Sequence, residues 1–232
     1  MKKYTYVDLL LALDVQAAHP GGLELTKRLL ATQPIDSKTC VLEAGCGKGE
    51  TAAYLSESYH CQVVAIDHHP DMVAKAVSTC APFPNVHVKE ATIEELPFPN
   101  DSFDLILSES VLAFLQAETG LKEMYRVLKK DGSLILLEMS QKTSMEEPEI
   151  EEIKRFYGIH KIHSKSDWKK LLNDVGFSKV DQLNITTEGE EGVDVTITEN
   201  MNDELLQLLD EHNRLMSKYG DELTYSVFHC EK

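Results

Sequence analysis

From about residue 39 onward, short apolar runs alternate with segments in which apolar residues recur at helical spacing. The apolar runs cover residues 39–44, 62–67, 86–89, 103–108 and 132–139. The helical segments cover residues 50–58, 71–79 and 118–129, and the last of them carries one stripe of Leu121, Met124, Tyr125 and Leu128. Strands that alternate with helices predict βαβ units, in which helices cover both faces of a mostly parallel sheet.

The two flanks of this alternating region predict further helices and two closing strands. The pattern indicates helices after Pro148 and over about 166–175, a strand near 179–186, an acidic turn at 188–192, a helix near 203–218 and a strand at 224–229. Residues 1–38 have a helical pattern, and we expect them to close over a site at the carboxyl ends of the strands. We therefore predict one domain over 1–232, with an N-terminal helical lid at 1–38, a core at 39–139, and lid helices and closing strands at 140–232.

Composition and charge narrow the range of partners. The chain has 232 residues, is 42% apolar and 27% charged, and carries 23 Lys and Arg against 39 Asp and Glu, a net charge of −16. Such a field repels phosphate backbones and anionic bilayers, so we expect neither nucleic acid nor a membrane as partner. Lys2 and Lys3 resemble the start of a signal peptide, but Asp8 and Asp14 interrupt the apolar run that follows. Five cysteines without a CxxC pair suit a reducing compartment, and we expect a cytoplasmic protein.

The most informative stretch is VLEAGCGKGE, where an apolar strand runs into three glycines at alternate positions and then into a helix. Glycines allow a ligand to approach the backbone closely. The next strand ends at Asp67, 22 positions after Gly45, where a carboxylate can accept hydrogen bonds from both ribose hydroxyls. The spacing GxGxG differs from the GxGxxG of dinucleotide sites. Glu43 places a negative charge beside the loop, which disfavours a pyrophosphate and suits an ammonium group.

Four segments together resemble the class I S-adenosylmethionine-dependent methyltransferases. They are VLEAGCGKG, VVAIDHHPDM, ATIEELPFPNDSFDLILSESVL and MYRVLKKDGSLILLEM, and they occur in the family's order across about 39–139. The resemblance implies a doubly wound, mostly parallel seven-stranded α/β sheet, the Rossmann-like methyltransferase fold, with an antiparallel final strand and helical lid elements. It also implies S-adenosyl-L-methionine as cofactor and S-adenosyl-L-homocysteine as product.

The resemblance places the cofactor on particular residues of this chain. The residues that it assigns to cofactor binding are Glu43, Gly45, Cys46, Gly47, Asp67, His68, Met72, Thr92, Ile93 and Ser108. In relatives with a similar segment, an Asp faces the adenine amino group where this chain has Thr92. The stretch from His19 to Gly22 resembles a segment that helps enclose the cofactor in some bacterial small-molecule methyltransferases.

For the acceptor side, we take Glu109 as the first candidate for a catalytic group, with His19, His160 and Glu138 behind it. A dedicated base is needed only where the nucleophile arrives protonated. His160 and His163 lie three positions apart with no third ligand in view, so a surface role outweighs a metal site, and we predict no metal. Cys46 can be a reactive thiol or only a small residue beside the cofactor.

Three functions are compatible with these residues. The first is methyl transfer to a small-molecule acceptor by in-line displacement. The second is a non-catalytic S-adenosylmethionine-binding regulator or partner subunit, because no unmistakable catalytic constellation stands out. The third is a nicotinamide-dependent oxidoreductase, which the GxGxG spacing and Glu43 disfavour. The accepting atom, whether oxygen, nitrogen, carbon or sulfur, stays open at this point, as does the oligomeric state.

Overall fold

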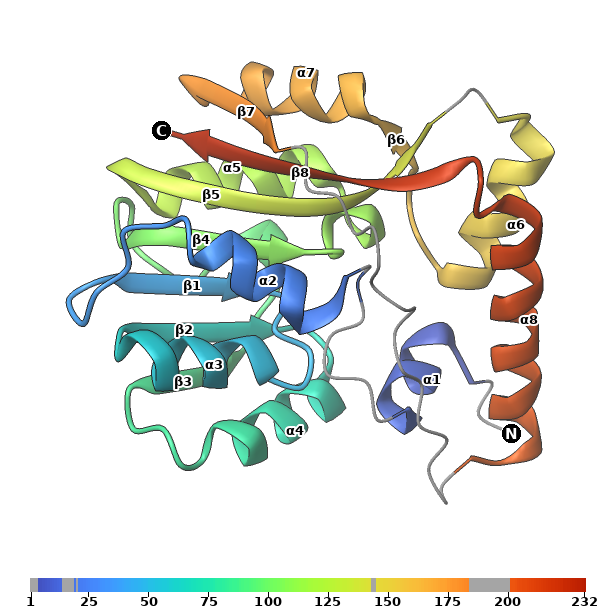
Figure 1. Cartoon of the computed structure of the whole chain (residues 1–232), viewed down its shortest axis with the longest axis horizontal. Coiled ribbons are helices and arrows are strands. Elements are labelled where there is room, and N and C mark those ends of the chain that lie inside the picture. The colour runs from blue at the N-terminus through green and yellow to red at the C-terminus, as the bar shows by residue number, and fades with distance from the viewer. Residues whose placement is uncertain (1–3, 14–18, 20, 143–144, 184–200) are drawn as a thin grey trace.

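The apolar runs form one twisted sheet in the computed structural model, which describes residues 4–13, 19, 21–142, 145–183 and 201–232 (Figure 1). The strands are β1 (Cys40–Ala44), β2 (Gln62–Asp67), β3 (Val86–Glu90), β4 (Phe103–Glu109), β5 (Leu128–Gln141), β6 (His163–Ser164), β7 (Lys179–Leu183) and β8 (Leu223–Glu231). Their order is β3-β2-β1-β4-β5-β8-β7, with the short β6 beside β5. Only β8 runs antiparallel to its neighbours, β5 and β7, within the described sheet. The predicted mostly parallel sheet with an antiparallel final strand is confirmed.

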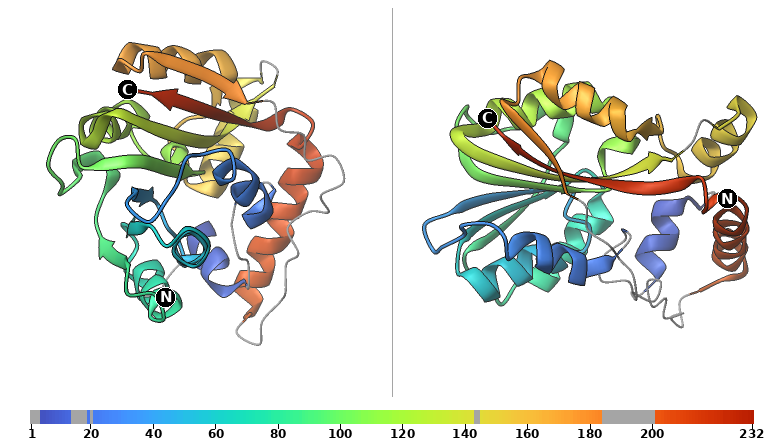
Figure 2. Two further views of the ribbon diagram at one scale, coloured as in Figure 1. Left: turned by 60° about the vertical axis from the view of Figure 1, so that its left-hand side comes forward. Right: turned by 45° about the horizontal axis from the view of Figure 1, so that its top comes forward.

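Helices cover both faces of this sheet and also stand across its carboxyl edge (Figure 1). The helical elements are α1 (Tyr6–Ala12), α2 (Gly22–Leu30), α3 (Glu50–Tyr59), α4 (Pro70–Cys80), η1 (Ile93–Glu95), η2 (Leu112–Phe114), α5 (Ala117–Val127), α6 (Glu147–Tyr157), α7 (Lys165–Val175) and α8 (Asp203–Tyr219). Figure 2 shows α5 and α7 on one face and α2 and α3 on the other. The segment 1–38, which we predicted as a helical lid, therefore holds two helices in different places. Helix α1 stands at the carboxyl edge of the sheet, and α2 lies on one of its faces.

The two faces bury alternate residues of the same strands. Leu42 and Ile106 belong to the core under α5 and α7, whereas Val41 and Leu107 belong to the core under α2 and α3. All four are fully buried. Alternation follows from strand geometry, because successive side chains point to opposite faces and both faces are covered here.

One predicted element boundary is wrong. The pattern placed 118–129 in a helix, but α5 ends at Val127 and β5 begins at Leu128. Leu128 is extended, pairs with Phe103 of β4 and is fully buried. The apolar stripe of α5 therefore continues into β5, because both elements bury their apolar side chains in the same core. The strand predicted near 179–186 is described as far as Leu183, and the predicted turn at 188–192 lies outside the described residues.

Neither a bilayer-crossing helix nor a disulfide occurs in the described structure. Within the described ranges, every helix is too short or too polar to cross a bilayer. The five cysteines are all free thiols, and four of them are buried.

Candidate functional site

The glycine loop after β1 is pinned to the end of β2. The amides of Gly45 and Cys46 both donate to the carbonyl of Ile66, each at 2.8 Å. Gly45 has φ +88°, and a Cβ built there would lie 2.3 Å from Val111 Cγ2. Gly47 has φ +51°, and a Cβ there would meet nothing within 4 Å. The first glycine is therefore required by close packing, and the second faces open space in which a ligand can approach the backbone.

Asp67 lies where the sequence places a ribose-binding carboxylate, directly beside this loop. Its Oδ2 accepts from the amide of Gly47 at 3.0 Å, and its Oδ1 accepts from the amide of His69 at 2.8 Å. The side chain is 11% exposed, while the neighbouring His68 is 64% exposed, with Nδ1 3.7 Å from Asp67 Oδ1. The carboxylate is thus held in place by backbone donors, and it retains a small solvent-facing surface for a ligand.

A small recess opens beside Gly45 and Asp67. Its lining comes from β1, β2, η1 and η2 and the loops next to them, and consists of Gly45, Asp67, His68, Ala91, Thr92, Ile93, Val111 and Leu115. Apolar walls with a carboxylate at one end suit a nucleoside, in which a flat ring is joined to a pair of hydroxyls. Five of the predicted cofactor residues meet here. Met72 is buried on α4, outside this lining.

Thr92 does more than line the recess. It is the N-cap of η1, and its Oγ1 accepts from the amide of Glu94 at 3.3 Å. Capping fixes the start of η1 and so the position of Ile93, which is buried against the recess.

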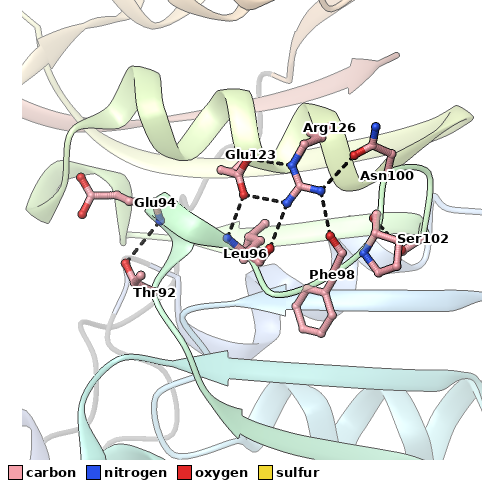
Figure 3. Close-up of polar contacts among 9 residues, drawn as sticks. Thr92, Glu94, Leu96, Phe98, Asn100, Ser102, Glu123 and Arg126 are labelled. Carbon is pink, nitrogen blue, oxygen red and sulfur yellow. Dashed lines mark hydrogen bonds and ion pairs between the residues drawn. The ribbon is translucent and has the colours of Figure 1, made fainter.

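A clamp from α5 holds the loop after η1, and the sequence analysis did not identify it. Figure 3 shows the guanidinium of Arg126 between this loop and Glu123. Arg126 donates to the carbonyls of Leu96 and Phe98 at 2.9 and 2.7 Å, and Glu123 accepts from the amide of Leu96 at 2.8 Å. A spacing of three between Glu123 and Arg126 is the only sequence signal, and it does not reveal the loop partner. The clamp thereby fixes the loop that follows η1, the element whose Ile93 lines the recess.

Two buried polar atoms near the loop have no hydrogen-bond partner among the described residues, Glu43 Oε2 and Ser108 Oγ. Glu43 is 5% exposed and Ser108 1% exposed. Burial raises the pKa of Glu43 well above its ordinary value, and the charges of Glu109 and Asp67 raise that pKa further. A buried polar group without a partner costs free energy. A cationic ammonium group of the cofactor would satisfy Glu43 and relieve this cost, so the residues present fit S-adenosylmethionine.

Cys46, in contrast, has the surroundings of a packing residue. The side chain is 6% exposed and belongs to the core under α2 and α3. Burial raises the pKa of the thiol, and the charges of Glu43 and Asp67 raise it further. Because the thiolate is the reactive form of cysteine, this environment favours the interpretation of Cys46 as a small packing residue with an unreactive thiol.

Tertiary structure brings together two acceptor-side candidates that lie 90 positions apart, His19 and Glu109. Glu109 ends β4, and its Oε1 accepts from Thr26 Oγ1 of α2 at 2.7 Å. His19 Nε2 lies 3.5 Å from the same Oε1 and 3.1 Å from Thr26 Oγ1. The side chains of His19 and Glu109 are 5% and 9% exposed. Burial raises the pKa of Glu109, and His19 and Thr26 oppose that rise.

Glu138, another acceptor-side candidate, contacts the backbone at the start of η2. It is fully buried in β5, and its Oε1 accepts from the amides of Val111 and Leu112 at 2.9 and 2.7 Å. These are amides at the start of η2, which otherwise lack partners within the helix. Glu138 therefore holds the segment that carries Val111 into the recess.

The remaining candidates lie at different places around the carboxyl edge. His160 is exposed; its amide donates to the carbonyl of Ala113 at 2.6 Å, and its Nε2 lies 2.9 Å from Gln116 Nε2. His163 packs on Trp168 at 4.4 Å between ring centroids, and burial lowers its pKa to about 4. Gly22 begins α2 with φ +51°. The part of the chain that the structure describes holds no cluster of His, Cys, Asp and Glu suited to a metal.

Known proteins share both the sequence and the fold of this chain. A family model described as a methyltransferase domain matches residues 42–136. An uncharacterized methyltransferase of Bacillus subtilis (strain 168), YodH, is 34% identical over 230 residues, which cover 96% of this chain and 97% of that protein. Phosphoethanolamine N-methyltransferase 3 of Arabidopsis thaliana is 28% identical over 164 residues, covering 69% of this chain and 33% of that protein. The structure of Haemonchus contortus phosphoethanolamine N-methyltransferase 2 in complex with S-adenosyl-L-methionine superposes with a TM-score of 0.81 at 16% identity, covering 98% of this chain and 56% of that one.

The chain therefore belongs to the class I S-adenosylmethionine-dependent methyltransferase family. It is an enzyme that uses S-adenosyl-L-methionine as its cofactor, as the four sequence segments predict. This assignment favours the first of the three functions over the nicotinamide-dependent alternative.

Proposed function

We propose that this enzyme transfers the methyl group of S-adenosyl-L-methionine to a small-molecule acceptor, and that it does so in the cytoplasm. The observation that carries the proposal is the Asp67 carboxylate, hydrogen-bonded to the Gly47 amide at 3.0 Å beside buried Glu43, whose Oε2 has no hydrogen-bond partner among the described residues. One carboxylate suits a pair of ribose hydroxyls and the other suits an ammonium group. The two groups of the cofactor are thus matched by residues from adjacent strands.

The residues proposed to hold the cofactor form a continuous surface along the carboxyl edge. Asp67 and His68 would bind the ribose, Thr92 and Ile93 the adenine, and Glu43 and Ser108 the methionine part. Gly45, Cys46 and Gly47 would pass beneath it, and Met72 of α4 would lie along the ribose and adenine. When bound, the cofactor supplies an electrophilic methyl group on a sulfonium. The protein's own contribution is to hold the acceptor in line and to exclude water.

The acceptor is proposed to lie between the carboxyl edge and the helices that stand across it. Figure 1 shows α1, α6 and α8 on this side of the sheet. Apolar side chains from η2 and β5, namely Phe114 and Met139, pack against the cluster formed by α6 and α8. Together with the polar side chains of Glu109 and His19, these apolar side chains suit a small organic molecule with an apolar part. The Arabidopsis and Haemonchus relatives are named for phosphoethanolamine, which also is a small molecule.

Calorimetric titration tests the proposal at its first step. We expect S-adenosyl-L-methionine and S-adenosyl-L-homocysteine to bind and to raise the melting temperature, whereas NAD and NADP leave it unchanged. Formation of S-adenosyl-L-homocysteine in the presence of small-molecule acceptors then reports transfer. Binding without transfer to any acceptor would favour the regulatory alternative, and absence of binding would exclude both.

A further inference from the structure

The Glu109 carboxylate lies at the end of a two-step hydrogen-bond chain built from separate parts of the molecule. Thr26 Oγ1 is 2.7 Å from Glu109 Oε1 and 3.1 Å from His19 Nε2. His19 precedes α2, Thr26 lies within α2, and Glu109 ends β4. The three side chains meet because α2 packs on the sheet face to which Leu105 and Leu107 of β4 point.

The direction of the hydrogen bonds follows from the donors and acceptors present. The carboxylate only accepts, so the Thr26 hydroxyl donates its single proton to Oε1. Thr26 Oγ1 must then accept from His19, which means that Nε2 of the imidazole carries a proton. The chain thus runs from His19 Nε2–H to Thr26 Oγ1–H to Glu109 Oε1. It orients the carboxylate and supplies positive polarity at one of its two oxygens.

The two side-chain contacts of Glu109 lie on one of its oxygens, Oε1, and not on the second oxygen, Oε2. Among the contacts of the described residues, both Thr26 and His19 meet Oε1. The Glu109 side chain retains 9% exposure. A proton accepted at Oε2 leaves Oε1 free to keep the Thr26 hydrogen bond, so the chain does not have to rearrange when Glu109 is protonated.

Burial of Glu109 favours uptake of a proton. The titratable groups facing it are His19 from the segment before α2 and Glu43 from β1, while its partner on β5 is the apolar Leu137. Burial raises the pKa of Glu109, with His19 and Thr26 as the opposing influences. A carboxylate with a raised pKa is a better proton acceptor near neutral pH than an exposed one.

We propose that Glu109 is the general base of the reaction, that Thr26 and His19 are its positioning residues, and that the acceptor is an oxygen or nitrogen nucleophile that arrives protonated. This inference rests on the proposed function. An alcohol, a phenol or an ammonium group satisfies it, whereas a thioether, or a pyridine that is unprotonated near neutral pH, has no proton to give up.

The step balances without a further reactant. The acceptor lone pair forms the bond to the methyl carbon, and the carbon–sulfur bond breaks with its electron pair left on sulfur as a thioether. The acceptor proton moves to Glu109 Oε2 and then to solvent. For an ammonium acceptor, the proton leaves before the lone pair can attack.

The decisive experiment uses the full chain with S-adenosyl-L-methionine and a panel of probes. The panel contains primary alcohols, phenols, primary and secondary amines, and, as counterparts that carry no acidic proton near neutral pH, thioethers and pyridines. Release of S-adenosyl-L-homocysteine and the mass of the product report transfer. We expect turnover only with the proton-bearing classes. Turnover confined to thioethers or pyridines would overturn the inference while leaving the proposed function intact, and absence of turnover across the whole panel would count against both.

Variants of the chain separate the base from a merely structural residue. Glu109→Gln should lower kcat by about 100-fold or more, with unchanged cofactor affinity. Thr26→Val removes a donor that lowers the pKa of Glu109, so the acidic limb of the kcat/KM profile should move to higher pH, and Thr26→Ser should restore it. Unchanged kcat in Glu109→Gln would overturn the assignment. Loss of cofactor binding in Glu109→Gln would instead identify Glu109 as a cofactor contact.

Discussion

The Asp67 carboxylate and the Gly47 amide are joined by a hydrogen bond of 3.0 Å, which connects the end of β2 to the glycine loop after β1. A second oxygen of the same carboxylate accepts from the amide of His69 at the start of α4. Asp67 therefore organises the loop and the helix entry, in addition to the ribose contact that we propose for it. The structural role and the proposed binding role fall on one side chain, and the first experiment has to separate them.

Replacement of Asp67 by Ala should weaken binding of S-adenosyl-L-homocysteine by about 1–3 kcal/mol, because ribose hydroxyls and the Gly47 amide lose their acceptor. Calorimetry measures this change. Asp71→Ala, at an exposed position in the first turn of α4, is the matched control and should bind normally. Equal affinity in Asp67→Ala and the wild type would show that the ribose lies elsewhere.

Gly45→Ala should reduce both stability and cofactor affinity, because the new Cβ would lie 2.3 Å from Val111 Cγ2. Overpacking of this kind costs about 1–3 kcal/mol. Gly158→Ala is the control, since Gly158 also has positive φ but open space around its Cβ position. Urea unfolding and calorimetry should show the larger loss in Gly45→Ala. Adding Val111→Ala should recover part of it; a double variant no better than the single one would contradict the packing argument.

Glu138 should make stability depend on pH. Burial raises its pKa from the ordinary 4.5 to about 7, against the lowering effect of the η2 amides. A carboxyl that binds its proton more tightly in the folded state stabilises the fold at low pH, and this contribution is lost as pH rises from about 4.5 to 7. Relative to Glu138→Gln, the wild type should therefore lose on the order of 3 kcal/mol over that window.

Urea unfolding at pH 5, 6, 7 and 8 measures the difference between wild type and Glu138→Gln. Glu57→Gln, at an exposed position on α3, serves as the reference and should follow the wild type at every pH. A constant difference between wild type and Glu138→Gln across the range would mean that Glu138 does not titrate there.

Arg126→Met should destabilise the loop after η1 more than a surface charge change does. Arg126 donates to two loop carbonyls and to Glu123, which itself accepts from the Leu96 amide. Loss of such a network costs about 1–3 kcal/mol. Lys122→Met, which breaks only an exposed pair with Glu118, should stay within about 0.5 kcal/mol of the wild type.

The same pair of variants reports whether the clamp serves the site. Because the clamped loop begins at Leu96, directly after η1 with Ile93, Arg126→Met should also weaken binding of S-adenosyl-L-homocysteine, and Lys122→Met should not. Normal affinity in Arg126→Met would confine the clamp to a stabilising role.

Several features of the fold and site follow from local sequence. Strand–helix alternation indicates a parallel sheet because buried strands and amphipathic helices leave different periodicities. The glycine loop and Asp67 also can be recognised locally, because each follows directly after an apolar strand. The helix predicted at 118–129 shows the limit of this reasoning, since periodicity alone did not reveal that Leu128 pairs with Phe103.

Other features were decided only by tertiary structure. From the sequence, His19, Glu109 and Glu138 were all predicted as candidates for the acceptor side, with nothing to show how they are arranged. Because α2 packs on the sheet near the end of β4, His19 and Glu109 meet through Thr26. Because β5 lies next to β4, Glu138 reaches the amides of η2. Arg126 acquired its loop partners in the same way. The physical reason is that residue pattern specifies which face of an element is buried, whereas strand order and helix packing specify which distant side chains share that burial.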